Sequence, residues 1–511
     1  MHATWFCKEC QKKHWRSHKL DCRVRMSEEK WAPSWEGDRK PPFYTDNPEL
    51  ATCTGLEKQL WGETPAIDIL ELRKNEGVQW KQDLSLLFYE AADLRNVVKT
   101  VVNLPKSFER NMTVVIDNTD MHITSRNIIM LLAMLILENP VEAAEFVIRP
   151  VLTNMYKTAR YSSDTAITIR TWTGGQAVLR LFLSKKDVVK LFSFLEVPFG
   201  LTADSAQEIR RSTVFWSKEV VDRVLLSQRG HWRHAAMHFR TTGILLPFGN
   251  SCDSFIYPNP TGWALPATAD PLQGWDMLDI LKTKNIGGAT NDIYGRMFFH
   301  VRDMLADFHS RVANKVIEIH HASAEDLKWH VQPFKFDRID TNTLGDMKYG
   351  GFSSVLVNMM PLLRSRTENK HATMLMLFIK AVEEMHWEDR HDKNVFEKEV
   401  RSMMKIVAPK TVQAAKGRMP REWNLKIYRM VDSLGLFRDR DYYFQQYMER
   451  WNFRDIAKVV EVKMKKRNTI VDEWPWRLKL ASCTPEAQRE FDIARASNCS
   501  GIERYVEWRW A

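Results

Sequence analysis

The chain has 511 residues, of which 44% are hydrophobic and 27% are charged. This length predicts roughly two to four domains, and the hydrophobic fraction supplies a large core, which excludes wholesale disorder. No run of about 18 uncharged apolar residues occurs, so we expect no membrane-spanning helix. The first residues include Cys, His and Lys where a secretory signal needs an apolar core, so we expect no signal peptide.

The net charge of +10 at neutral pH is compatible with acidic partners, including nucleic acid. The basic residues are interspersed with acidic ones, however, and the densest basic patches, at residues 12–16 and 463–467, are short. We therefore expect that the protein does not bind nucleic acid. Seven cysteines in a chain of this length do not form a disulfide framework, which indicates an intracellular protein of the cytoplasm or nucleus.

The first 22 residues contain the most specific chemical motif of the sequence. Cys7, Cys10, His18 and Cys22 follow the spacing Cys-x2-Cys-x7-His-x3-Cys. Three thiolates and one imidazole are the ligand types of a tetrahedral zinc site. These four residues are therefore the predicted zinc ligands.

The stretch Cys10-Gln-Lys-Lys-His-Trp-Arg-Ser-His-Lys-Leu-Asp-Cys22 resembles the second half of a MYND-type zinc finger. This resemblance implies the binding of zinc and of short proline-containing peptides. A full MYND finger has four further cysteines upstream and two cross-braced zinc ions, so each ion would keep only half of its ligands here. Three alternatives stay open: a sequence that starts too late within a finger for two zinc ions, one zinc ion held by all four residues, or a disordered remnant.

Residues 84–139 alternate between short apolar runs and helical spacing. Residues 84–89 and 112–117 have the length and composition of buried strands, whereas 94–102 and 125–137 place apolar residues at helical spacing. This order of strand, helix, strand and helix is how one half of a doubly wound sheet begins. We therefore predict an α/β, Rossmann-like (methyltransferase-like) fold with a mostly parallel sheet and helices on both faces.

The turn after the first predicted strand, Glu90-Ala-Ala-Asp93, contains no glycine. Sites for dinucleotides or S-adenosylmethionine use glycine in this turn because the backbone must approach the ligand closely. We expect Asp93 to cap the following helix and Asp117 to end the second strand. The sequence thus predicts a Rossmann-like body without a cofactor.

The alternative is an S-adenosylmethionine-dependent methyltransferase with a degenerate turn. Its binding site would consist of Ala92, Asp93 and Asp117, since an acid that binds ribose is expected about 20 residues after the turn. We also expect a buried polar network that holds the turn and links the two helices, made of Asp93, Arg95, Arg126 and Asn127.

Two further stretches carry a second resemblance. Trp61-Gly-x2-Pro-Ala-x-Asp-x-Leu70 and Leu86-Leu-Phe-x3-Ala-Asp-Leu-Arg-Asn-Val-Val-Lys-Thr100 resemble a fungal domain of unknown function, DUF4470, which often follows a MYND finger. A similar domain opens the dynein axonemal assembly factor 3 family, which implies a scaffold or assembly role. The resemblance continues in segments to about residue 480, including residues 336–340, 370–378 and 468–478.

These patterns predict a chain with the following order of parts: a partial MYND-type finger (1–22), a linker (23–51), a DUF4470-like Rossmann-like half (52–160), the rest of the α/β body with long loops (161–345), a helical C-terminal region (346–480) and a tail (481–511). Helices are expected at residues 292–320, 371–407 and 439–466, and residues 484–511 are expected to be a frayed appendage.

No nucleophile elbow, zinc-protease motif or phosphate-binding loop occurs in the sequence. The expected function is therefore a zinc-binding, non-enzymatic adaptor or scaffold that mediates protein–protein interaction through the finger and the cofactor-less body. The methyltransferase remains the alternative.

Overall fold

The structure is a computed structural model of the chain. It describes residues 61–148, 177–194, 228–250, 270–314, 317–323, 334–406, 433–480, 484–497 and 499–511. Shorter described pieces are 24–28, 31–33, the backbone of 166–170, and single positions within 12–19 and 200–225. The four predicted zinc ligands, Cys7, Cys10, His18 and Cys22, lie outside the described residues.

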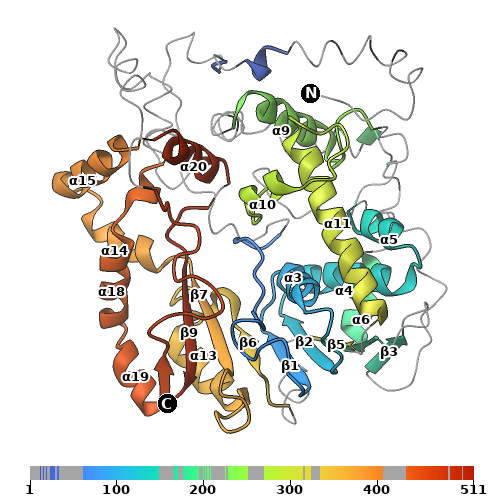
Figure 1. The fold of residues 1–511 in the computed structure, drawn as a ribbon, viewed down its shortest axis with the longest axis vertical. Helices are drawn as coiled ribbons and strands as arrows, with labels where there is room; N and C mark the ends of the chain where they lie inside the picture. Colours follow the sequence, from blue (N-terminus) through green and yellow to red (C-terminus); the bar gives the residue numbers. More distant parts are fainter. Residues whose placement is uncertain are drawn as a thin grey trace.

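A mixed, mostly parallel sheet forms the centre of the molecule (Figure 1). Within the described residues it has nine strands in the order β3-β4-β5-β2-β1-β6-β7-β9-β8. The strands are β1 (Leu84–Phe88), β2 (Met112–Asn118), β3 (Ala166–Arg170), β4 (Val178–Phe182), β5 (Ile317–Ser323), β6 (Arg338–Asp340), β7 (Thr373–Phe378), β8 (Val462–Met464) and β9 (Arg504–Trp510). The strands from β4 to β7 pair in parallel, while β3 pairs antiparallel with β4, and β9 pairs antiparallel with both β7 and β8.

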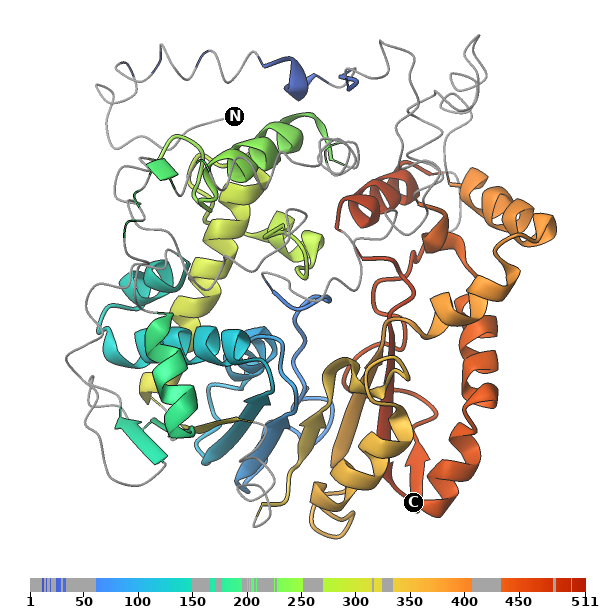
Figure 2. The ribbon, with the colours of Figure 1, turned by 180° about the vertical axis from the view of Figure 1, so that it is seen from behind.

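Helices cover both faces of this sheet (Figures 1 and 2). They are α3 (Arg95–Asn103), α4 (Met121–Ile136), α5 (Pro140–Ile148), α6 (Lys185–Ser193), α9 (Gly230–Thr242), α10 (Met277–Lys282), α11 (Ile293–Asn314), α13 (Phe352–Met359), α14 (Ala381–Asp389), α15 (Lys393–Met404), α18 (Arg440–Arg450), α19 (Phe453–Val459) and α20 (Pro485–Ala496). Short 3-10 turns follow β6 and α13, at Asn342–Gly345 and Met360–Leu362. None of the helices in the described ranges combines the length and the apolar character needed to cross a membrane.

The two faces of the sheet belong to two different hydrophobic cores, because successive side chains of a strand point in opposite directions. Leu86 and Val114 belong to the larger core, which also contains buried residues of α3, α4 and α11. Leu87 and Val115, the next residue of each strand, belong to a second core with α13, α14, α18 and α19. The near-continuous apolar character of β1 and β2 thus follows from burial on both faces.

The predicted strand, turn, helix, strand and helix over residues 84–139 are confirmed as β1, α3, β2 and α4. The mixed, mostly parallel sheet with its helices is in line with the predicted Rossmann-like arrangement. Its last strand, β9, lies antiparallel between β7 and β8, which the sequence did not predict. Asp120 begins α4 and accepts a hydrogen bond from the His122 N–H, as an N-cap residue does.

Four predictions for the second half of the chain were wrong, wholly or in part. Residues 484–511 are not a frayed appendage, because α20 packs there and β9 pairs with β7 along five residues. The predicted helix at 371–407 contains β7, whose six residues are all buried, before α14 and α15 begin. The predicted helices at 292–320 and 439–466 each end in a strand, β5 and β8, respectively. The helical C-terminal region therefore also completes the sheet.

Part of the expected linker packs against the body. The guanidinium group of Arg233, in α9, donates hydrogen bonds to the carbonyl oxygens of Met26 and Glu28, at 3.0 and 2.5 Å. It also lies 5.1 Å from the ring of Trp31. Arg233 is buried, so these contacts are shielded from water and fix residues 24–33 on α9 where the structure describes them.

Candidate functional site

The candidate site is the carboxyl edge of the sheet, beside the central strand β1. The strand order reverses there: the chain proceeds from β1 to β2 on one side and from β6 to β7 on the other. In open α/β sheets a ligand binds in the crevice outside the carboxyl ends of the strands at such a reversal. In this chain the crevice lies above the ends of β1, β2 and β6.

The turn after β1 is fixed to the end of β2. Glu90 has a left-handed backbone conformation, with φ of 53°. Its N–H donates to Oδ1 of Asp117 at 2.9 Å, and the Ala91 N–H donates to the Asp117 carbonyl oxygen at 2.9 Å. The Asn118 amide donates to the Ala91 carbonyl oxygen at 3.1 Å. One carboxylate oxygen of Asp117 thus stabilises the turn by accepting a hydrogen bond from it.

Asp93 and Arg95 form a buried ion pair at the start of α3. Nε of Arg95 lies 2.7 Å from Oδ2 of Asp93, and the Arg95 N–H donates to Oδ1 at 2.7 Å. The prediction that Asp93 accepts from a free N–H of the helix is therefore confirmed. Burial alone would raise the pKa of Asp93, but the charge of Arg95 and the N–H donors of Arg95 and Gly62 outweigh it and lower the pKa.

The predicted polar network is confirmed for three of its four residues. Nη2 of Arg126, in α4, donates to the Ala92 carbonyl oxygen at 2.9 Å, which ties the second helix to the same turn as Asp93 and Arg95. Asn127 is fully buried nearby, but its amide makes no hydrogen bond to the described residues.

The chain's own residues 61–62 lie directly on this turn. The Gly62 N–H donates a hydrogen bond to Oδ2 of Asp93. A Cβ placed on Gly62 would lie 2.8 Å from Nη2 of Arg95 and 3.5 Å from the Cβ of Ala92. A side chain at position 62 would force the Arg95 guanidinium to move, so the main chain of Gly62 lies close beside the turn.

Two tryptophans close the crevice over Arg95. The rings of Trp61 and Trp275 meet edge to face with centroids 5.5 Å apart. The guanidinium carbon of Arg95 lies 5.9 Å from the Trp61 ring and 5.3 Å from the Trp275 ring, which is within the range of cation–π attraction. Gly274 has a left-handed φ of 76°, and a Cβ on it would lie 2.1 Å from the Gly62 carbonyl oxygen.

Residues 61–70, called the covering segment below, continue across the edge of the sheet. The hydroxyl of Thr64 lies 3.4 Å from that of Tyr505, in β9. Asn96, in α3, accepts from the Ile67 N–H at 2.9 Å and donates to Oδ2 of Asp340, at the end of β6, at 2.9 Å. The covering segment is therefore hydrogen-bonded to α3 and, through Asn96, to β6.

The structure places the three residues of the alternative cofactor site at the turn and at the end of β2. Asp93 accepts a hydrogen bond from Gly62, a Cβ added to Gly62 would lie 3.5 Å from the Cβ of Ala92, and Asp117, which holds the turn, is completely buried. The second carboxylate oxygen of Asp117 has no hydrogen-bond partner among the described residues. Burial raises the pKa of Asp117 well above its usual value, and burial also raises the pKa of Asp340.

The residues that close the crevice were not predicted as site residues. They are Trp61, Gly62, Gly274 and Trp275. The sequence offers one signal for them, because a tryptophan stands next to a glycine in each pair. The two pairs are more than 200 positions apart, so no periodic pattern relates them.

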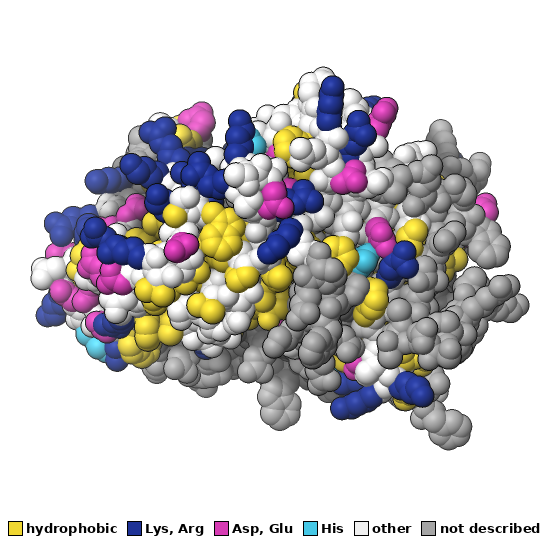
Figure 3. Space-filling model, turned by 90° about the horizontal axis from the view of Figure 1, so that it is seen from below, with side chains coloured by type: hydrophobic (Ala, Val, Ile, Leu, Met, Phe, Trp, Pro, Cys, Tyr) yellow, Lys and Arg dark blue, Asp and Glu magenta, His cyan; other side chains and the backbone are white. Residues whose placement is uncertain are grey.

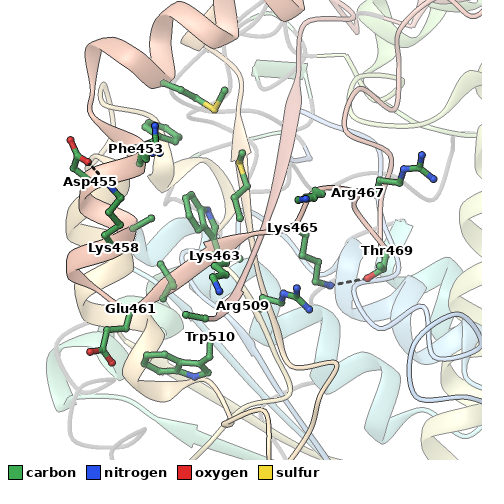
Figure 4. Close-up of a pocket in the computed structure, with 18 of the residues that line it drawn as sticks. Phe453, Asp455, Lys458, Glu461, Lys463, Lys465, Arg467, Thr469, Arg509 and Trp510 are labelled. Atoms are coloured by element: carbon green, nitrogen blue, oxygen red, sulfur yellow. Dashed lines mark hydrogen bonds and ion pairs between the residues drawn. The ribbon is translucent and has the colours of Figure 1, made fainter.

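A second feature is an open groove at the far edge of the sheet, with a volume of about 1420 Å³ (Figure 4). It is lined by α18, α19, β8, β9 and the loop that follows β8. Figure 3 shows many lysine and arginine side chains on this side of the molecule, with hydrophobic side chains between them. The basic residues of the groove are Lys370, Arg454, Lys458, Lys463, Lys465, Lys466, Arg467 and Arg509. We call it the basic groove.

The described part of the chain contains no cluster of three or more His, Cys, Asp or Glu residues that is suited to hold a metal ion. The predicted zinc site involves residues outside this part, so it stays a prediction.

Residues 60–154 match the family model of a domain of unknown function, DUF4470. This part of the chain is a DUF4470 domain. It contains β1, α3, β2, α4, α5 and the covering segment, so the segment that closes the crevice and the turn beneath it belong to one domain. No curated protein and no solved structure matches the chain significantly.

Proposed function

We propose that this protein is a non-enzymatic adaptor. In its Rossmann-like body, residues 61–62 of the DUF4470 domain occupy the position in which a cofactor would bind. The observation that carries the proposal is the position of Gly62, whose N–H donates to Asp93 and on which an added Cβ would lie only 3.5 Å from the Cβ of Ala92. An adenosyl ligand in its usual place would need this space.

Opening the crevice for a ligand would be costly. Displacing residues 61–62 removes one N–H donor from a buried carboxylate and one indole ring from the Arg95 guanidinium. The Asp93 carboxylate would then need a new donor, because a buried acceptor that loses its hydrogen bond destabilises the folded state by about 1–3 kcal/mol. A ligand would have to supply this free energy before it gained any affinity.

The adaptor role also includes a zinc-binding N-terminal module, with Cys7, Cys10, His18 and Cys22 as ligands. The donor set suits tetrahedral zinc. The anchoring of residues 24–33 on α9 by Arg233 supports this role, because a segment that follows directly on the module is held against the body. The resemblance to MYND fingers implies that the module binds proline-containing peptides. Metal analysis of the purified chain tests the module: about one zinc per chain is expected, and a metal-free chain would contradict it.

The alternative function is an S-adenosylmethionine-dependent methyltransferase. Two observations favour it: the antiparallel strand β9 lies between β7 and β8, as in methyltransferase-like sheets, and one carboxylate oxygen of Asp117 has no hydrogen-bond partner among the described residues. In that case the covering segment would be a flap that leaves the turn when the ligand binds.

Isothermal titration calorimetry of the full chain with S-adenosylmethionine tests the proposal. We expect no binding heat at ligand concentrations up to about 1 mM, the weak end of specific binding. Micromolar affinity that disappears in Asp117→Ala, with the circular dichroism spectrum unchanged, would overturn the adaptor proposal in favour of the methyltransferase.

A further inference from the structure

The basic groove contains cations that no carboxylate of the described residues neutralises. Lys463, Lys466, Arg467 and Arg509 form no ion pair within the described part of the chain, unlike Lys465, which lies 2.8 Å from Glu507. Lys463 and the two loop residues are exposed, whereas Arg509 is half-buried and its Nε has no hydrogen-bond partner among these residues. An anionic partner would therefore meet charges that are available for pairing.

The loop that presents Lys466 and Arg467 is held in place by one buried carboxylate. Glu507 is completely buried and accepts hydrogen bonds from the N–H groups of Thr469 and Ile470, at 3.0 and 2.8 Å. It also accepts from the Thr469 hydroxyl at 3.2 Å. Because this loop is already ordered, a partner would lose less entropy on binding to it.

Strand β8 forms one end of the sheet, and no strand of the described residues pairs with its outer edge. The Lys465 N–H donates to the Glu507 carbonyl oxygen, and the Ala511 N–H donates to the Glu461 carbonyl oxygen, at 2.8 and 3.0 Å. In an antiparallel ladder the intervening residues direct their N–H and C=O groups the other way. The main-chain groups of Val462 and Met464 therefore point toward the outer edge.

The two faces beside this edge differ in chemistry. Lys463 is directly opposite Arg509 in the β8–β9 pair, so both side chains lie on one face of the sheet. Val462 is opposite Trp510 and Met464 is opposite Trp508, so these side chains lie on the other face. The result is a basic face and an apolar face that meet at an unpaired strand edge.

We propose that the outer edge of β8 binds an extended peptide segment in which acidic and apolar residues alternate. Such a segment would add a strand to the sheet, with main-chain hydrogen bonds to Val462 and Met464. Its acidic side chains would face Lys463 and Arg509, and its apolar side chains would face Met464, which is 38% exposed, and Trp510. This proposal names a partner class for the adaptor and rests on that proposed role.

An acidic peptide suits the groove better than a nucleic acid does. Glu449, in α18, also lines this groove. So do Asp455 and Glu461, on the α19 side (Figure 4). A strand places alternate side chains on opposite faces, so a peptide can keep all its carboxylates on the basic face. A phosphodiester backbone carries a charge at every nucleotide and would also meet these three carboxylates.

Fluorescence anisotropy with the full chain tests the proposal. The probe is a labelled peptide of about ten residues, the length of a long strand, in which Asp and Val alternate. Three comparison ligands complete the set: the same residues with all Asp at one end, the alternating peptide with N-methyl groups on its valines, and a single-stranded oligonucleotide. We expect the alternating peptide to bind at least roughly tenfold more tightly than each of them.

Two variants locate the binding site. Lys463→Glu and the double variant Lys466→Glu/Arg467→Glu should each weaken binding of the alternating peptide by roughly tenfold or more. Lys284→Glu, an exposed lysine elsewhere on the body, should leave it unchanged. All three variants change exposed residues, and equal thermal midpoints would show that folding is intact.

Equal affinity for the alternating and block peptides, or loss of binding in Lys284→Glu as well, would overturn the proposal. So would preferred binding of the oligonucleotide, or no binding at all, in which case the lysines only guard the strand edge against unwanted pairing. These outcomes leave the closed crevice unaffected, whereas binding of S-adenosylmethionine would overturn the adaptor role without involving the groove.

Discussion

The Gly62 N–H donates a hydrogen bond to the Asp93 carboxylate, in the turn where a Rossmann-like fold ordinarily meets its cofactor. The turn without glycine and the covering segment are therefore two parts of one arrangement. Ala92 supplies a methyl group to the turn, and a Cβ added to Gly62 would lie 3.5 Å from it. The turn and the residues that lie next to it belong to the same domain.

A side chain at position 62 should destabilise the protein. In Gly62→Ala the new Cβ would lie 2.8 Å from Nη2 of Arg95, which Asp93 and two indole rings hold in place. We expect a loss of about 1–3 kcal/mol in the free energy of unfolding, and a larger loss in Gly62→Val. Urea denaturation measures it. Gly435→Ala is the matched control, because a Cβ there meets nothing within 4 Å, and an equal loss in both variants would contradict the packing described.

Because Asp93 and Arg95 form a buried ion pair, the stability losses of their single variants should not add up in the double variant. Arg95→Met leaves Asp93 buried without its cation and should cost about 3–5 kcal/mol. The double variant Asp93→Asn/Arg95→Met removes the unpaired charge and should recover much of this loss. Denaturation of the two single variants and the double variant gives the coupling energy. Simple addition of the two single losses would show that the pair is not coupled.

Asp68, in the covering segment, predicts a pH dependence. Burial raises the pKa of Asp68 from 3.8 to about 6. The folded chain therefore binds a proton that the unfolded chain has released, and this contribution to stability is lost as pH rises through the window from about 4 to 6. Asp68→Asn keeps an acceptor oxygen for the N–H groups of Leu70 and Glu71 but cannot ionise.

The thermal midpoint of Asp68→Asn relative to wild type should therefore increase between about pH 4 and pH 6.5 and then level off. Differential scanning fluorimetry across this range measures it. The exposed Asp307→Asn should show no such trend. A midpoint difference for Asp68→Asn that is constant with pH would contradict the role assigned to Asp68.

Substitution of Glu507 should make the loop of the basic groove more susceptible to proteolysis. Glu507→Gln removes the charge that pairs with Lys465 and weakens the hydrogen bonds to Thr469 and Ile470. We expect trypsin to cleave after Lys466 and Arg467 roughly tenfold faster, because local opening becomes easier. Mass spectrometry of a digestion time course identifies the cleavage sites. The exposed Glu461→Gln should be cleaved at the wild-type rate, and faster cleavage in both variants would argue against a specific role of Glu507.

Local patterns were sufficient to predict strands β1 and β2 and helices α3 and α4. The apolar runs of β1 and β2 and the helical spacing of α3 and α4 follow from burial on both faces of a parallel sheet. The contact between Asp93 and the Arg95 N–H spans only two residues, so capping chemistry predicts it. The contact of Arg126 with the turn could also be predicted, because the turn and α4 belong to the same unit of β1, α3, β2 and α4.

Contacts between residues far apart in the sequence could not be predicted from such local patterns. The six-residue run of β7 consists of Thr, Met, Leu and Phe, and a short apolar run of this kind fits a buried helix as well as a strand. In β9, Tyr505, Val506 and Trp508 are buried, and the strand pairs with β7 and β8, which no pattern at the end of the chain indicates. The contact of Gly62 with Asp93 depends on the return of residues 61–62 across the sheet, 31 positions away.

Hydrogen–deuterium exchange of the covering segment tests the central claim most directly. The N–H groups of Gly62, Ile67 and Ile69 donate to Asp93, Asn96 and Thr100, respectively, so peptides covering residues 61–70 should exchange as slowly as those of β1. Added S-adenosylmethionine should not change this rate. Complete exchange within seconds, or protection that appears only when S-adenosylmethionine is added, would mean that the segment is an open flap over a working cofactor site.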